Sequence, residues 1–167
     1  MADPGQAAPD ATVSHASPGV SFRSSPDPSP PILLDTHVWI WAAEGNARRL
    51  PPRVLAALDR ASQEGRLRVA AISVWEVGLL EARNRLAFNR PVADWVQAAL
   101  TAPGVQLYPL APEVALESTR LPGEPPTDPA DRMIIATARH GAATLCTADA
   151  PILRYGEAGH VRVLSAR

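Results

Sequence analysis

From residue 32 onward, short apolar runs alternate with longer segments in which apolar residues recur every three or four positions. Short runs are typical of strands, and the longer spacing is typical of helices that bury one face. The predicted strands are 32–34, 67–72, 105–107, 143–147 and 161–164. The predicted helices are 38–43, 52–62, 73–86, 91–100, 112–120, 128–140 and 150–155. Because strands that alternate with helices pair in parallel, the pattern predicts an α/β fold, a three-layer α/β/α sandwich with a small, mainly parallel sheet.

Residues 1–31 have a different composition. They contain seven prolines and six serines, few large apolar residues and no periodicity. Such a segment buries too little apolar surface to offset the entropy that is lost on ordering. We therefore predict a disordered Pro/Ser-rich tail over 1–31 and one folded domain over 32–167.

Charge and composition narrow the function classes. The chain carries 16 basic residues against 17 acidic ones, which argues against a strongly basic DNA-binding domain, although a local basic patch stays compatible with it. Every basic residue is an arginine, and the absence of lysine excludes P-loop and Schiff-base chemistry. Cys146 is the single cysteine, and the sequence shows neither a signal peptide nor a membrane-spanning run. We therefore expect a cytoplasmic location and no membrane association.

Four acidic residues stand where α/β sheets usually bind ligands, beyond the carboxyl ends of the strands. Asp35 directly follows the first predicted strand, and Asp149 follows the fourth. Glu76 and Asp131 lie in the first turns of two predicted helices. We therefore expect these four side chains to meet in one cleft.

The spacing around two of these acids predicts that they point inward. Ile134 and Ile135 lie three and four positions after Asp131, and apolar residues also lie three and four positions after Glu76. Both carboxylates therefore share a helix face with core residues. An inward carboxylate is costly unless it is paired or bound to a metal, and the chain has no lysine to pair it.

Purely structural roles remain open for each acid taken alone. Ser73 and Glu76 have the spacing of a capping box, in which the Glu side chain binds a backbone amide. Asp128 fits a helix N-cap, and Asp131 would then lie in the first turn, where the helix dipole favours negative charge. The two acids at strand ends fit turn-forming roles. The combination of all four acids favours a shared site.

Carboxylates that share one cleft repel each other and raise one another's pKa unless a divalent cation neutralises them. Oxygen donors without a His or Cys cluster favour Mg²⁺ or Mn²⁺ over zinc, and the four histidines are scattered along the chain. Such an ion polarises a phosphoryl oxygen and makes a water more acidic, which is the chemistry of phosphodiester cleavage. The residues therefore indicate a metal-dependent hydrolase whose simplest substrate is a nucleic-acid strand.

Four motifs that contain these acids resemble the PIN-domain family, and more narrowly the VapC-type toxins of type II toxin–antitoxin pairs. The motifs are 33–41 (LLDTHVWIW), 72–77 (ISVWEV), 128–136 (DPADRMIIA) and 146–149 (CTAD). The resemblance implies a PIN-like nuclease domain over 32–167 that acts as a toxin, an endoribonuclease that depends on Mg²⁺ or Mn²⁺ and hydrolyses RNA phosphodiesters. It also implies a cognate antitoxin protein as partner and a homodimer.

The same resemblance assigns roles to individual residues. The acids that correspond to the catalytic and metal-binding residues of the family are Asp35, Glu76, Asp131 and Asp149. Thr147 corresponds to a hydroxyl residue that orients a ligand, and Asp128 to an extra acid that ligates weakly or only caps its helix. Arg132 adjoins Asp131 and is an auxiliary candidate for contacting RNA.

Two alternatives to this function remain open. The same fold can serve as a catalytically inactive PIN-like module that binds protein, with the acids acting as helix caps. The chain can also be a nuclease that acts on DNA, because composition does not separate the two substrates.

The first predicted helix, 38–43, is apolar on all sides, which is unusual for a surface helix. Either one side meets another chain, or the helix is fully buried. In the resembling toxins, the C-terminal segment of the antitoxin occupies a groove formed by early helices. Trp39, Trp41 and Trp75 are therefore our candidates for lining or supporting partner-binding surfaces.

Overall fold

One parallel sheet organises the molecule. The computed structural model describes residues 29–167, so residues 1–28 of the predicted tail lie outside the described residues. Five strands pair in the order β3-β2-β1-β4-β5, and every neighbouring pair is parallel. The strands are β1 (Ile32–Leu34), β2 (Leu67–Ala70), β3 (Val105–Tyr108), β4 (Thr144–Thr147) and β5 (Val163–Ser165). The predicted small parallel sheet is confirmed.

Residues just before β1 already belong to the fold. The Pro31 carbonyl accepts a hydrogen bond from Thr144 N (2.8 Å), next to β1 in the sheet. The Pro30 carbonyl accepts one from Arg66 Nη1 (2.8 Å). The contacts of the domain therefore begin before residue 32, its predicted start.

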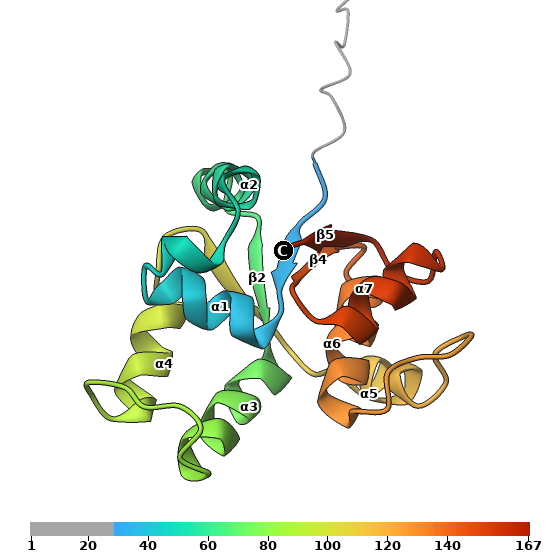
Figure 1. Cartoon of the computed structure of the whole chain (residues 1–167). Coiled ribbons are helices and arrows are strands. Elements are labelled where there is room, and N and C mark those ends of the chain that lie inside the picture. The colour runs from blue at the N-terminus through green and yellow to red at the C-terminus, as the bar shows by residue number, and fades with distance from the viewer. Residues whose placement is uncertain (1–28) are drawn as a thin grey trace, which may run out of the picture.

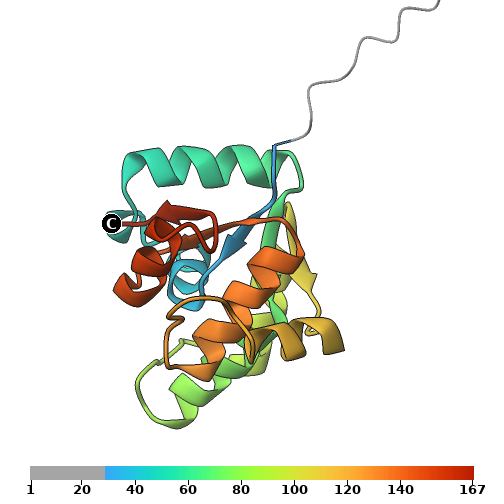
Figure 2. The ribbon, with the colours of Figure 1, turned by 90° about the vertical axis from the view of Figure 1, so that its right-hand side faces the viewer.

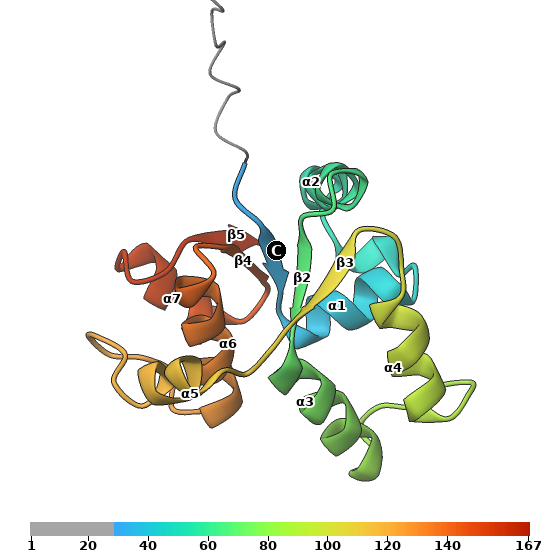
Figure 3. The ribbon, with the colours of Figure 1, turned by 180° about the vertical axis from the view of Figure 1, so that it is seen from behind.

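Helices cover both faces of the sheet. They are α1 (Thr36–Ala43), the 3-10 helix η1 (Ala47–Arg49), α2 (Pro52–Gln63), α3 (Ala71–Ala82), α4 (Val92–Leu100), α5 (Pro112–Ser118), α6 (Pro129–His140) and α7 (Ala150–Glu157). Figures 1 and 3 show α1, α2 and α4 on one side and α5, α6 and α7 on the other. Among the helices of residues 29–167, none is both long and apolar enough to cross a membrane. The predicted three-layer α/β/α sandwich is confirmed.

The alternation of side chains along β1 explains why both faces are covered. Ile32 and Leu34 belong to the core that includes Trp39 of α1 and Trp95 of α4. Leu33 belongs to the second core, which α5, α6 and α7 complete. A strand that is buried on both faces reads as a continuous apolar run, which is what the sequence has at 32–34.

The strands all point toward the same end of the molecule. Their carboxyl ends lie on the side from which α3 projects (Figure 1). The helix α2, drawn in teal, lies along the opposite end (Figure 2). Residues that follow β1 and β4 are close in space, because these two strands are neighbours in the sheet.

The passage from β2 to α3 differs from the prediction. The strand ends at Ala70 and the helix begins at Ala71 without a loop, whereas the predicted strand continued to Ile72. The two residues after the strand are apolar, so the hydrophobic pattern does not mark the change from strand to helix. The helix also ends at Ala82 rather than at residue 86, and Asn84 has a positive φ of 54° that leaves the helical path.

Candidate active site

Asp35 is the most buried acid of the molecule and lies between β1 and α1. Its side chain is only 5% exposed. Its Oδ1 accepts a hydrogen bond from Thr36 N (2.7 Å), which makes it the N-cap of α1. Its Oδ2 accepts one from the Thr147 hydroxyl (2.7 Å) at the end of β4. Asp35 therefore both forms the turn from β1 into α1 and lies at the carboxyl end of a strand, as predicted.

Thr147 connects two of the predicted acids. Its buried hydroxyl donates to Asp35 and accepts a hydrogen bond from Asp149 N (2.9 Å). Asp149 in turn caps α7, because its Oδ1 accepts from Ile152 N (3.0 Å). A single hydroxyl thus holds the first and the last acid of the predicted set in a fixed relation.

Glu76 reaches the same place from α3. Its Oε2 accepts a hydrogen bond from the Thr36 hydroxyl (2.5 Å), directly beside Asp35. The capping box proposed for Ser73 and Glu76 is wrong, because α3 begins at Ala71 and its N-cap position is Ala70. Ser73 instead lies inside the helix, and its buried hydroxyl has no hydrogen-bond partner within the described part of the chain. Glu76 consequently lies in the second turn, not the first.

Thr36 is the site residue that sequence reasoning missed. It is buried, and its backbone amide binds Asp35 while its hydroxyl binds Glu76. The available signal was its position directly after the first acid. Its partner Glu76 is 40 residues away, so local spacing could not identify the bond.

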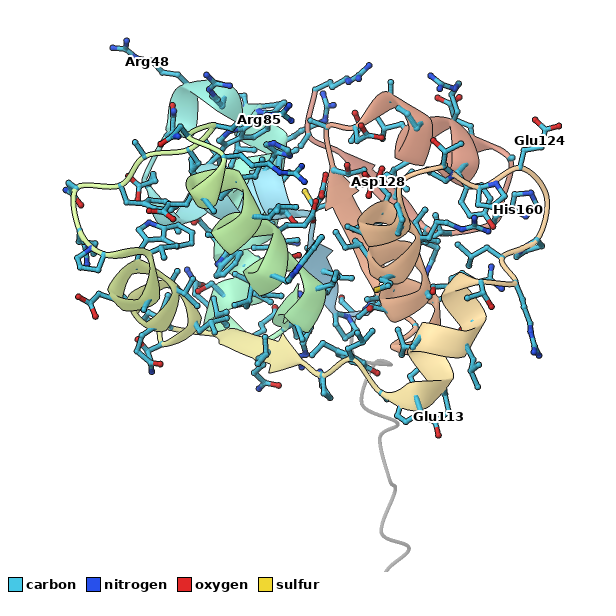
Figure 4. All side chains as sticks on the ribbon, turned by 90° about the horizontal axis from the view of Figure 1, so that it is seen from below. Arg48, Arg85, Glu113, Glu124, Asp128 and His160 are labelled. Carbon is cyan, nitrogen blue, oxygen red and sulfur yellow. The ribbon has the colours of Figure 1, made fainter. Side chains whose placement is uncertain are left out.

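Asp128 and Asp131 come from the start of α6. The Oδ1 of Asp128 accepts from Ala130 N (2.8 Å) and from Asp131 N (3.3 Å), with Pro129 at the first helical position. The predicted N-cap is confirmed. Asp131 is half-buried in the first turn, where the prediction placed it. Figure 4 shows α3 and α6 side by side, with Asp128 near the line between them.

Each of five acids either raises the pKa of another acid of the set or has its own pKa raised by one. They are Asp35, Glu76, Asp128, Asp131 and Asp149. Burial raises the pKa of Asp131 to about 7, with further increases from the charges of Asp149, Asp128, Asp35 and Glu76. Burial also raises the pKa of Glu76, and the charges of Asp35 and Asp128 add to that increase. The pKa of Asp35 is raised mainly by burial and, in smaller part, by Asp149. Neighbouring carboxyls therefore add to the effect of burial on the pKa of these acids.

None of the ion pairs within residues 29–167 includes one of these acids, although the positive charge of His37 lowers the pKa of Asp35 and of Glu76. The ion pairs there are Arg66 with Glu64 and Arg139 with Glu117. Neither involves the acid cluster, by which we mean Asp35, Glu76, Asp128, Asp131 and Asp149. Arg132, the auxiliary candidate, donates its Nε to the carbonyl of Ser118 at the end of α5 (3.1 Å). This contact gives Arg132 a role in joining α6 to α5.

The donors fit a hard divalent cation in kind and in charge. They are carboxylate oxygens that form no ion pair within residues 29–167, and such oxygens are the ligands that Mg²⁺ and Mn²⁺ prefer. Among the described residues, however, no three or more His, Cys, Asp and Glu side chains are already arranged to hold a metal ion. The described side chains therefore do not form a ready-made ion site.

The three tryptophan candidates lie in different surroundings. Trp39 is 1% exposed and packs against Trp95 in the core, with ring centroids 5.1 Å apart, so it supports α1 from inside. Trp41 is half-buried, with the Arg49 guanidinium 5.5 Å from its ring centroid. Trp75 is 57% exposed on α3. Burial of Trp39 thus explains one apolar face of the first helix. Of the three tryptophans, Trp75 exposes the largest fraction of its surface.

The sequence profile of the PIN domain matches residues 32–158, which is most of the chain. The chain belongs to the PIN-domain family. It is also 39% identical over 112 residues to Ribonuclease VapC22 of Mycobacterium tuberculosis, a match that covers 66% of this chain and 81% of that protein. The resemblance seen in the sequence is therefore confirmed.

Solved structures of the same fold agree. VapBC2 from Rickettsia felis, bound to a promoter DNA fragment, matches with a TM-score of 0.59 at 11% identity and covers 81% of this PIN-domain chain and 98% of that chain. FitAcB from Neisseria gonorrhoeae matches with a TM-score of 0.55 at 25% identity and covers 81% and 97%. These matches support the PIN-like arrangement of the sheet and its helices.

Proposed function

We propose that this PIN-domain chain is a VapC-type ribonuclease, the toxin of a toxin–antitoxin pair, which hydrolyses RNA phosphodiesters. The proposal is supported by the 39% identity to a protein named Ribonuclease VapC22 across 81% of that protein's length. The observation that carries it is the set of hydrogen bonds by which Thr36 holds Glu76 beside Asp35 and Thr147 connects Asp35 with Asp149. Carboxyls whose pKa is raised, as it is for Asp35, Glu76 and Asp131, are typical of functional sites when they lie at the strand ends.

The residues that would hold Mg²⁺ or Mn²⁺ are Asp35, Glu76, Asp131 and Asp149. When bound, such an ion supplies Lewis-acid chemistry, polarising a phosphoryl oxygen and making a water more acidic. Asp128 already binds two backbone amides, so we assign it mainly to capping α6.

The chain's own hydroxyls position the carboxylates. Thr147 holds Oδ2 of Asp35, and Thr36 holds Oε2 of Glu76, so that each carboxylate keeps its other oxygen free of side-chain partners. Oδ1 of Asp35 binds only the backbone amide of Thr36. Hydrogen bonds of this kind fix ligand orientation and raise the affinity of the site.

Asp131 changes its ionisation near neutral pH as long as no ion is bound. With a pKa of about 7, a carboxyl oxygen of Asp131 accepts or releases a proton near neutral pH in the free protein. A bound divalent cation would favour the ionised carboxylate, so we assign Asp131 to ion binding and not to proton transfer.

The similarity to a VapC ribonuclease also indicates partners. We propose a cognate antitoxin protein as the inhibitor, a homodimer as the assembled state and the cytoplasm as the place of action. The aromatic residues available for these contacts are Trp75 and Trp41, since Trp39 is buried.

The test compares the unchanged full chain with an Asp35→Asn variant on end-labelled single-stranded RNA and on DNA of the same sequence. We expect RNA cleavage that EDTA stops and that added Mg²⁺ or Mn²⁺ restores. Asp35→Asn should lower cleavage by at least about 100-fold, the upper range for loss of a group that only supports a ligand. The matched control is Asp59→Asn, because Asp59 is exposed on α2, at the far end from the acids.

The outcomes separate the candidate functions. Undiminished cleavage by the Asp35→Asn variant would remove the assigned role of the acid cluster. Cleavage of DNA but not RNA would make the chain a DNA nuclease. No cleavage, together with no saturable effect of Mn²⁺ on thermal stability, would favour the inactive protein-binding module.

A further inference from the structure

A pocket of about 810 Å³ adjoins the acid cluster between the loop before α6 and the helix α7. Residues that line it include Gly123, Glu124, Asp128, Asp131, Arg154 and His160. Asp128 and Asp131 therefore belong both to this pocket and to the acid cluster. Figure 4 shows Glu124 and His160 on the same side of the molecule as Asp128. A strand whose phosphate lies at the acids can extend directly into the pocket.

The pocket is held open by contacts between its two walls. The Tyr155 hydroxyl of α7 donates to the Pro122 carbonyl (2.7 Å), and Tyr155 is only 3% exposed. The rings of Tyr155 and His160 lie 4.7 Å apart, and Arg139 donates to the His160 carbonyl. Gly123 has a positive φ of 68°, and a Cβ at this position would collide with the His160 ring. The imidazole therefore lies in the pocket wall, between Tyr155 and Gly123.

The pocket lining is more acidic than basic, which does not fit a surface that binds nucleic acid through its phosphates alone. The lining contains one guanidinium, that of Arg154, and three carboxyls, those of Glu124, Asp128 and Asp131. Surfaces that bind nucleic acid through phosphates alone are basic. Acceptor groups combined with a ring in the wall suit the amino groups and flat face of a nucleobase. The exposed guanidinium of Arg154 forms no ion pair within residues 29–167 and can bind a single phosphate beside that base.

We propose that this pocket receives the base of the nucleotide adjacent to the cleaved phosphodiester of single-stranded RNA, and that Arg154 and His160 are specificity-determining residues. Arg154 binds the phosphate of that nucleotide, and the His160 ring contacts its base. The inference rests on the proposed ribonuclease function, because it names how that site selects its substrate. It makes the sequence preference of cleavage a property of α7 and its flanking loops.

The binding experiment uses the full chain with Asp35→Asn, so that RNA stays intact. Fluorescence anisotropy compares short single-stranded RNAs that differ in one nucleotide. We expect Arg154→Gln to weaken binding of every RNA by about tenfold, because a phosphate contact does not depend on the base. We expect His160→Ala to reduce the difference among the four bases, because the imidazole nitrogens can bind the edge of a base. The matched control is Arg60→Gln, an exposed arginine of α2 at the far end of the molecule.

The cleavage experiment makes the two proposals separately testable. The chain with Asp35 intact and either pocket substitution is given a long RNA, and its cleavage sites are mapped. A changed site preference with retained cleavage supports the pocket. Cleavage at unchanged sites, with unchanged discrimination among the short RNAs, overturns the pocket and leaves the ribonuclease standing. If no form of the chain cleaves, the ribonuclease fails and the binding experiment alone decides the pocket. Arg154→Gln keeps this decision available even if His160→Ala fails to fold.

Discussion

The hydroxyl of Thr36 donates a hydrogen bond to Oε2 of Glu76 (2.5 Å), which joins the first turn of α1 to the second turn of α3. This bond lowers the pKa of Glu76 and opposes the increase caused by burial. Thr36 also donates its backbone amide to Asp35, so one residue serves two acids. The bond is therefore part of what keeps Glu76 beside Asp35.

The first prediction concerns this hydroxyl. Thr36→Val removes the donor at a buried position of similar shape, and we expect a further increase in the pKa of Glu76. Mn²⁺ affinity by calorimetry and the kcat/KM for RNA cleavage should both fall by about tenfold. Thr36→Ser keeps the hydroxyl and should keep both values. Equal Mn²⁺ affinity in the Val and Ser variants would contradict a positioning role for Thr36.

The second prediction concerns Thr147. Thr147→Val leaves Oδ2 of Asp35 and the amide of Asp149 without their hydroxyl partner in a buried place. We expect the free energy of unfolding, measured in urea, to fall by about 1–3 kcal/mol. RNA cleavage should fall as well, whereas Thr147→Ser should retain most of both. A Val variant with unchanged stability would mean that water replaces the hydroxyl at no cost.

Much of this site could be predicted from the sequence, for identifiable reasons. Asp35 and Asp149 follow strands that are neighbours in the sheet, and parallel strands bring their carboxyl ends together. Asp128 and Asp131 could be placed because an N-cap followed by proline marks a helix start. In each case, a local pattern fixes the position of the side chain.

The parts that could not be predicted depend on contacts between distant segments. The bond from Thr36 to Glu76 needs the start of α3 at Ala71, which the apolar run there does not mark. Arg132 follows Asp131 in the sequence, but consecutive residues of a helix do not face the same way. The guanidinium of Arg132 therefore binds Ser118 of α5. Adjacency along the chain does not reveal this contact, and the auxiliary role of Arg132 toward RNA stays a prediction.

The third prediction concerns the pH dependence of stability. The pKa of Asp131 rises from 3.8 to about 7 on folding, so between these values the folded chain holds more protons than the unfolded chain. Stability therefore falls as pH rises through this window, and the loss is complete above about pH 7. Asp131→Asn removes this contribution. In EDTA at pH 8, we expect the variant to melt about 3 °C higher than the unchanged chain, corresponding to about 1 kcal/mol after allowance for solvent screening.

The same comparison at other conditions checks the cause. Near pH 3, below both pKa values, the melting temperatures of the two proteins should converge, because Asp131 is then mostly protonated in the folded and in the unfolded chain. Added Mn²⁺ should stabilise the unchanged chain more than the variant, because a ligand that binds the folded state stabilises it. Asp59→Asn, on exposed α2, should show neither effect. If the two proteins differ in melting temperature by the same amount at both pH values, the titration of Asp131 is not the cause.

The last prediction concerns Trp75, which is 57% exposed on α3. A large aromatic side chain on the surface costs little to replace in the isolated chain, so Trp75→Gln should change the free energy of unfolding by less than about 0.5 kcal/mol. Buried aromatic residues carry much of the energy of protein interfaces. We therefore expect Trp75→Gln to weaken self-association or antitoxin binding at least about tenfold, measured by sedimentation and by calorimetry. Trp75→Phe should keep most of the affinity, and a Gln variant that associates as tightly as the unchanged chain would exclude this face of α3 from both interfaces.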